Sequence, residues 1–182
     1  MSTLTTTTYT MTQPEPAAAD AAAIALGPSS GETARTFTAA CLSGKNQYKM
    51  TGLPLACVVC HCTTCRRHSG APYLHTAAWL NANVEQTAGG GADDVVSNSH
   101  TDALVRRACK HCGGVVASET PAYGLTALHL GCIEDAYEGN THRAVFKPQC
   151  HLFYGSRVAD VIDGAPKMAK KAPADGMLPE TL

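Results

Sequence analysis

Three cysteines fall within six residues, in the run CHCTTC that begins at Cys60. In an extended strand, side chains two residues apart point to the same face, so Cys60 and Cys62 share a face. A turn through the two threonines can then bring Cys65 back toward them. Zinc binds thiolates tetrahedrally, and a site with three protein ligands keeps its fourth position open for water or substrate. The spacing therefore predicts an open zinc site of the catalytic type.

Other uses of closely spaced cysteines fit this run less well. The chain has nine cysteines, an odd number, and they cluster too locally for a framework of disulfides. Redox Cys-x-x-Cys pairs are an alternative, but overlapping pairs in one run favour a metal. Cys57, Cys132 and Cys150 do not continue the ligand spacing, and we expect them to pack as small apolar side chains.

A second motif, CKHCGG, begins at Cys109. Two cysteines three residues apart, followed by glycines, are typical of a zinc knuckle, a tight turn in which backbone amides approach the sulfurs. Such a knuckle needs a second pair of ligands elsewhere in the chain.

Composition and charge limit the classes of partner. The chain has 182 residues, a formal net charge of −1 and a pI of about 6.7, so it has no general electrostatic reason to bind nucleic acid or an anionic membrane. No apolar run reaches the roughly 18 residues of a membrane span, and the N-terminus lacks the pattern of a secretory signal. We expect a cytoplasmic protein with reduced thiols and a small-molecule partner; the sequence leaves the oligomeric state open.

The chain divides into one folded unit and two tails. Residues 1–35 are rich in threonine, alanine and proline and predict a disordered tail. A mitochondrial presequence is a weaker alternative, because such a presequence is rich in arginine and Arg35 is the only positively charged residue of this segment. Residues 164–182 hold three prolines and few large apolar side chains, and predict a loose C-terminal tail. The folded domain is expected over residues 36–163.

Short segments rich in strand formers, many separated by glycine-bearing turns, fill this domain. Few of them show a sustained helical period, so the fold class is predicted as mainly β, built from short antiparallel strands and hairpins. The expected strands are 36–41, 47–51, 55–62, 76–80, 103–108, 114–118, 125–130 and 144–154.

The motifs together resemble the glutathione-dependent formaldehyde-activating enzyme family, which has an Mss4-like β fold. The resemblance spans about residues 36–157 in order, and its most specific part is the run CHCTTCRRHSGAP from Cys60. The other matching pieces are Cys41-x-Ser43-Gly44 with Tyr48, Arg107-x-Cys109-x-x-Cys112-Gly113, Pro148-x-x-His151 and Ser156-Arg157.

This resemblance implies two zinc sites and an activity. Cys60, Cys62 and Cys65 would hold the catalytic zinc. Cys41, Cys109 and Cys112 would belong to the structural zinc. Enzymes of the family join formaldehyde to the glutathione thiol, and the wider class is that of carbon-sulfur lyases, so glutathione is the implied co-substrate.

One position departs from the family pattern, because Ser43 stands where a fourth structural cysteine is expected. A serine hydroxyl stays protonated at neutral pH and is a poor zinc ligand. The site is then completed by water or His111, binds zinc weakly, or is empty. We predict a weakened but occupied site.

Three further residues are candidates for binding and proton transfer. Arg66 and Arg67 follow the thiol run, where a guanidinium can hold a carboxylate through two hydrogen bonds. On a strand, neighbouring side chains point oppositely, so we expect at most one of them to reach a ligand. His151 is the first candidate for proton transfer, with a buried, hydrogen-bonded histidine as the alternative.

Two functional classes follow. The first is a zinc-dependent enzyme of the lyase type, acting on a glutathione adduct such as S-hydroxymethylglutathione or, in a divergent member, on another carbonyl or lactone in specialised metabolism. The second is a non-catalytic zinc module that binds a protein partner, because fold does not fix function. A fourth protein ligand at the three-cysteine run would favour the second class.

Overall fold

The computed structural model describes residues 35–91, 95–101, 104–134 and 144–170 of the chain. The predicted N-terminal tail lies almost entirely outside these residues, as does the predicted tail beyond residue 170. The described part is mainly β, as predicted, with one α-helix and two sheets. None of its helices has both the length and the apolar surface to cross a membrane.

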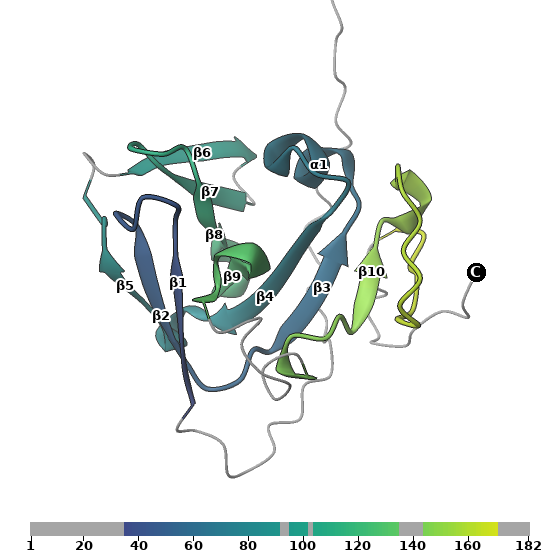
Figure 1. Ribbon diagram of the computed structural model, residues 1–182, viewed down its shortest axis with the longest axis horizontal. Helices are drawn as coiled ribbons and strands as arrows, with labels where there is room; N and C mark the ends of the chain where they lie inside the picture. Colours follow the sequence, from purple (N-terminus) through teal and green to yellow (C-terminus); the bar gives the residue numbers. More distant parts are fainter. Residues whose placement is uncertain (1–34, 92–94, 102–103, 135–143, 171–182) are drawn as a thin grey trace, which may run out of the picture.

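The smaller sheet has three antiparallel strands in the order β1-β2-β5 (Figure 1). The larger sheet has seven strands in the order β10-β3-β4-β9-β8-β7-β6, antiparallel except that β10 runs parallel to β3. The bounds are β1 Thr36–Ala40, β2 Gln47–Thr51, β3 Ala56–Cys60, β4 Leu74–Leu80, β5 Val84–Ala88, β6 Val95–Thr101, β7 Leu104–Cys109, β8 Val115–Thr120, β9 Leu125–His129 and β10 Cys150–Leu152. The helix α1 spans Thr63–Ser69, and short 3-10 turns occupy Asn81–Asn83, Pro121–Tyr123, Leu130–Cys132 and Tyr154–Ser156.

The core fills the space between the two sheets. In β1, Phe37 and Ala39 are buried while their neighbours are more exposed, as the two-residue period of a strand requires. Phe37 packs against Trp79 of β4 and against Phe146, with ring centroids 6.0 and 5.2 Å apart. Trp79 also donates a hydrogen bond to the Gly52 carbonyl at 2.9 Å, which satisfies its buried N–H.

The opposite face of the larger sheet carries polar side chains. The register pairs Thr76 of β4 with His129 of β9, and Arg106 of β7 with Ser118 of β8. Strand alternation places these four residues away from the core, on the side shared by Cys60 at the end of β3. The sheet therefore offers a polar surface beside the predicted catalytic cysteines.

Two expected strands differ from the structure, and two observed strands were not expected. The strand expected over 55–62 ends at Cys60, and a helix begins at Thr63. Of the strand expected over 144–154, only Cys150–Leu152 is formed among the described residues. β5 and β6, with the sequences VEQTA and VVSNSHT, were not expected, because short polar segments become strands only when a neighbouring strand pairs with their backbone.

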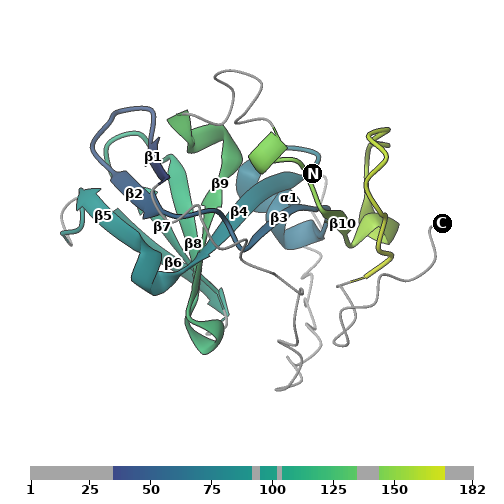
Figure 2. The ribbon, with the colours of Figure 1, turned by 90° about the horizontal axis from the view of Figure 1, so that it is seen from below.

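The segment from Ala165 to Lys170 falls in the range predicted as a loose tail, but it packs on the domain beside β10. Met168 is buried, and its amide donates to the His151 carbonyl at 2.8 Å. These backbone hydrogen bonds cannot be read from a sequence rich in proline and lysine. Both views place the three-stranded sheet at one end of the molecule and β10 with this segment at the other (Figure 1, Figure 2).

Candidate metal centre

The end of β3 and the start of α1 bring three thiols together. Cys60 is the last residue of β3, Cys62 is the N-cap of α1, and Cys65 lies in the first turn of that helix. The Cys62 thiol accepts a hydrogen bond from the Cys65 amide at 3.3 Å, as a capping side chain does. The three sulfur atoms lie within 4.8 Å of one another. The predicted turn is therefore the first turn of a helix.

Hydrogen bonds within this cluster already favour a thiolate. The thiols of Cys60 and Cys65 lower the pKa of Cys62, whereas the hydrogen bond to Cys62 raises the pKa of Cys60. Arg106 brings its Nη2 atom to 3.9 Å from the Cys65 sulfur. The cluster thus combines soft sulfur donors with a nearby positive charge.

The donor set fits zinc. A tetrahedral zinc with bonds of about 2.3 Å needs sulfur atoms about 3.8 Å apart, a separation that thiols within 4.8 Å reach by small side-chain rotations. Three thiolates are ligands that zinc accepts readily. Among the residues that the structure describes, no fourth cysteine, histidine or carboxylate joins this group.

A second group of thiols forms where the two sheets meet. Cys41 follows β1, Cys109 ends β7, and Cys112 lies in the turn before β8; their sulfurs also lie within 4.8 Å of one another. The Ser43 hydroxyl is 3.3 Å from the Cys41 sulfur and 3.5 Å from the Cys109 sulfur. Ser43 therefore occupies the place of a fourth ligand, and His111 is not part of the group.

Backbone amides stabilise negative charge at this second group. The Asn46 amide donates to the Cys41 sulfur at 3.3 Å. Hydrogen bonds from the Ser43 hydroxyl and from the Gly114 and Ser43 amides lower the pKa of Cys112 to about 6. This is the knuckle arrangement that the glycines after Cys112 predict.

Arg66 and Arg67 lie on α1 and not on a strand, which corrects the argument that they must point in opposite directions. On a helix, consecutive side chains are about 100° apart. The Arg66 Nε donates to the His61 carbonyl at 3.1 Å, which ties α1 to the end of the preceding loop. Arg67 is exposed and makes a polar contact of its own.

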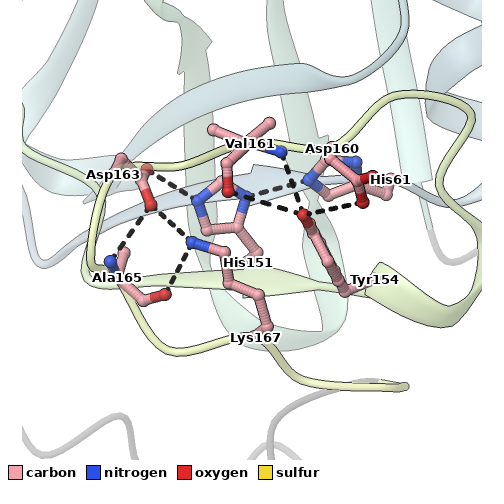
Figure 3. Close-up of polar contacts among 8 residues, drawn as sticks. All are labelled: His61, His151, Tyr154, Asp160, Val161, Asp163, Ala165 and Lys167. Carbon is pink, nitrogen blue, oxygen red and sulfur yellow. Dashed lines mark hydrogen bonds and ion pairs between the residues drawn. The ribbon is translucent and has the colours of Figure 1, made fainter. Parts of the chain in front are cut away.

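His151 is buried in a hydrogen-bonded chain (Figure 3). Its Nδ1 lies 2.9 Å from His61 Nε2, and its Nε2 lies 2.8 Å from the Asp163 carboxylate. Asp163 also accepts from Lys167 Nζ at 2.5 Å and from the Ala165 amide at 3.0 Å. The structure thus brings His151 to His61, which lies between Cys60 and Cys62 in the chain, and places no thiol of that cluster in hydrogen-bond contact with His151.

Arg106 and Asp163 were not among the site residues predicted from the sequence. Arg106 is buried on the polar face of the sheet, where His129 hydrogen-bonds Ser118 at 2.9 Å and its ring lies 6.0 Å from that of His68. Burial, with His68 and Arg106 nearby, lowers the pKa of His129 to about 4. The sequence signal that could have found Arg106 is strand alternation, which places Arg106 and Arg107 on opposite faces of the sheet. Its contact with the Cys65 sulfur depends on the tertiary structure.

All nine cysteines are free thiols, which excludes disulfides as the reason for their clustering. Cys57, Cys132 and Cys150 lie outside both groups of three. Cys57 is buried, and burial raises its pKa to about 12, so it remains a protonated packing residue at neutral pH.

A known protein family matches the folded part of the chain. The sequence profile of the family described as glutathione-dependent formaldehyde-activating enzyme matches residues 36–156. A crystal structure of a Rhodobacter sphaeroides protein is similar at 14% sequence identity with a TM-score of 0.45, over 59% of this chain and 94% of that chain. No curated protein matches the sequence.

Proposed function

Because the chain belongs to the glutathione-dependent formaldehyde-activating enzyme family, we propose that it is a zinc-dependent enzyme of the carbon-sulfur lyase type. Its proposed substrates are glutathione and formaldehyde, or their adduct S-hydroxymethylglutathione. In the forward direction the thiol sulfur forms a bond to the carbonyl carbon, and the thiol proton ends on the carbonyl oxygen. The reverse reaction breaks that carbon-sulfur bond.

The observation that carries this proposal is the group of three thiols at Cys60, Cys62 and Cys65, with no fourth protein ligand among the described residues. Zinc held there would supply an open position at which an incoming thiol is deprotonated or a carbonyl oxygen is polarised. A binding module needs no open position and would more naturally close its site with four ligands. The three-ligand group therefore supports an enzyme over a non-catalytic zinc module.

The chain's own residues have distinct proposed roles. Cys60, Cys62 and Cys65 hold the catalytic zinc, while the second group of thiols with Ser43 holds a structural zinc. Arg66 and Arg67 lie within one turn of Cys65 on α1, from which a guanidinium can bind a substrate carboxylate.

His151 receives a proposed positioning role. It is 0% exposed and contacts Asp163 on one side and His61 on the other, so it reaches the thiol cluster only through the backbone that His61 shares with Cys60 and Cys62. The two buried histidines, with the partly exposed Asp163 at the end of the chain, fix the orientation of both rings and thereby the path of the backbone between the two ligands. The free thiols fit a reducing compartment, and the proposed location is the cytoplasm.

Exchange NMR on glutathione with formaldehyde tests the proposal. Zinc-loaded protein is expected to accelerate interconversion of the thiol and its hydroxymethyl adduct above the uncatalysed rate. The Cys62→Ser variant should remain folded, bind less zinc at this group and lose the acceleration. Equal acceleration by both proteins would remove the catalytic zinc site. No acceleration by zinc-loaded wild type would direct the search to other carbonyl or lactone substrates.

A further inference from the structure

Arg106 is a buried charged side chain whose role is not set by the thiol motifs. It lies in the middle of β7, is 4% exposed, and pairs in register with Ser118 on the polar face of the sheet. Its Nη2 atom lies 3.9 Å from the Cys65 sulfur, and its Nε atom has no hydrogen-bond partner among the described residues. The guanidinium therefore points toward the thiol cluster.

A guanidinium keeps its charge in proteins, and a buried charge without a counter-charge is strongly unfavourable. Within the described part of the chain, no carboxylate pairs with Arg106. The adjacent Arg107 shows the contrast, since it points to the other face and contacts both carboxylate oxygens of Glu119, at 2.5 and 3.2 Å. Ser118 and His129, the polar neighbours of Arg106 on its own face, hydrogen-bond each other.

The thiol cluster can supply the missing negative charge. Three thiolates around a zinc ion carry a net charge of −1, and one guanidinium balances it. A charge-assisted contact from nitrogen to sulfur also fixes the Cys65 side chain, in the way that groups behind metal ligands orient those ligands. Cys65 is the ligand contributed by α1, so the contact joins the helix to β7 on the far side of the cluster.

We propose that Arg106 is the electrostatic partner of the zinc site at Cys60, Cys62 and Cys65, a positioning residue that neutralises the three-thiolate centre and raises its affinity for zinc. This inference rests on the proposed function, because it assumes that these thiols bind zinc. Neutralising the centre also favours approach of an anionic thiolate such as that of glutathione. The proposed role of Arg66 and Arg67 in binding the substrate carboxylates is unchanged.

The test is a zinc titration with a readout at each cysteine. Full-length reduced, metal-free protein is equilibrated at a series of buffered zinc concentrations and pulsed with an alkylating reagent, and protection of each thiol is measured by mass spectrometry of peptides. Arg106→Met removes the charge with a side chain suited to burial, Arg106→Lys retains the charge, and Arg107→Met is the matched control on the opposite face of β7. Trp79 fluorescence checks that each variant is folded.

For Arg106→Met, half-protection of Cys60, Cys62 and Cys65 is expected at about 10- to 100-fold higher zinc than in wild type, the range found for groups behind metal ligands. Arg106→Lys should recover most of this loss, and protection of Cys41, Cys109 and Cys112 should not change. Arg106→Gln replaces the Met variant if the latter does not fold.

Three results would count against the proposed role. An unchanged protection curve for the uncharged variant overturns it, and so does an equal shift for Arg107→Met. A lysine variant as weak as the methionine variant overturns the electrostatic role. Absence of zinc protection at Cys60, Cys62 and Cys65 in wild type instead removes the proposed zinc enzyme itself, so the two failures are distinguishable.

Discussion

The second thiol group differs from the first because the hydroxyl of Ser43 lies beside its three sulfur atoms. Its hydroxyl lies 3.3 Å from the Cys41 sulfur and 3.5 Å from the Cys109 sulfur, so it reaches the place of a fourth zinc ligand. A hydroxyl keeps its proton at neutral pH and can donate it to one neighbouring sulfur, whereas a fourth cysteine would ionise and bind. The fold therefore preserves the geometry of a four-ligand site while the chemistry provides three strong ligands.

At the residue scale, Ser43→Cys should tighten zinc binding at this second group. We expect at least a tenfold gain in affinity, which raises the free energy of unfolding in zinc by about 1.4 kcal/mol because only the folded state binds the metal at this site. Thermal unfolding with buffered zinc and with chelator measures it, with the exposed Ser156→Cys as the matched control. A variant that melts like wild type in zinc would argue against a metal at this group.

At the scale of elements, β10 and the segment after Gly164 form a strap along the edge of the larger sheet. β10 pairs with β3, and the His151 amide donates to the Pro166 carbonyl at 2.8 Å on the other side. Asp163 connects the two through His151 and Lys167 (Figure 3). Burial raises the pKa of Asp163, but hydrogen bonds from Lys167, His151 and the Ala165 amide outweigh it and hold the pKa below its usual value.

This shift predicts a pH-dependent loss in Asp163→Asn. A carboxyl with a lowered folded-state pKa stabilises the protein above its unfolded pKa of about 3.9 and loses that contribution as the pH falls through the folded value. We expect the variant to be less stable than wild type by about 1 to 3 kcal/mol at pH 7, with a smaller difference at pH 3. Urea unfolding followed by Trp79 fluorescence measures both.

Asp160→Asn provides the comparison for this prediction. The Asp160 side chain is 73% exposed and pairs with Arg157 on the surface, so its loss should leave the midpoint of urea unfolding close to that of wild type. If Asp163→Asn behaves like Asp160→Asn at pH 7, the strap is not held by the carboxylate.

At the scale of the whole molecule, the two thiol groups have different places in the architecture. Cys41 follows β1 of the three-stranded sheet, and Cys109 ends β7 of the seven-stranded sheet, so the second group joins the sheets at their edge. Cys60, Cys62 and Cys65 all lie within one segment of β3 and α1. A metal at the second group therefore closes a contact between sheets, whereas a metal at the first group joins neighbours in sequence.

This difference predicts that Cys109→Ser and Cys62→Ser separate stability from activity. Loss of zinc from the second group should lower stability by about 3 kcal/mol, or Tm by about 10 °C for a domain of this size. Cys62→Ser should shift Tm by less than about 3 °C and abolish catalysis, because its group closes only a short loop.

Calorimetry with and without chelator distinguishes the two variants. Chelator should lower the Tm of wild type to near that of Cys109→Ser and should have little effect on Cys109→Ser itself. Equal Tm values for the two variants in zinc would show that both thiol groups contribute equally to stability.

The sequence by itself determined the cysteines of the first thiol group, the family and the mainly β class. The thiol group and the strands rest on short-range spacing: three thiols within six residues can meet through one turn, and two-residue alternation marks strands such as Gln47–Thr51 without knowledge of their partners. The family rests on the resemblance of motifs along residues 36–157, which also implied the place of Cys41 in the second group. The expected strand over 55–62 was too long at its C-terminal end because a thiol as N-cap gives no strong local helix signal.

Only the tertiary structure decided what surrounds the thiols. Arg106 and Cys65 are 41 residues apart, and His61 and His151 are 90 apart, so their contacts follow from the order and register of strands in the sheet. The segment 165–170 packs because β10 offers it unpaired backbone groups, which a local reading of proline and lysine cannot reveal. Short-range sequence patterns indicate which thiols can act as metal ligands. Pairing between strands that are far apart in the sequence places the charged groups and hydrogen bonds around those thiols.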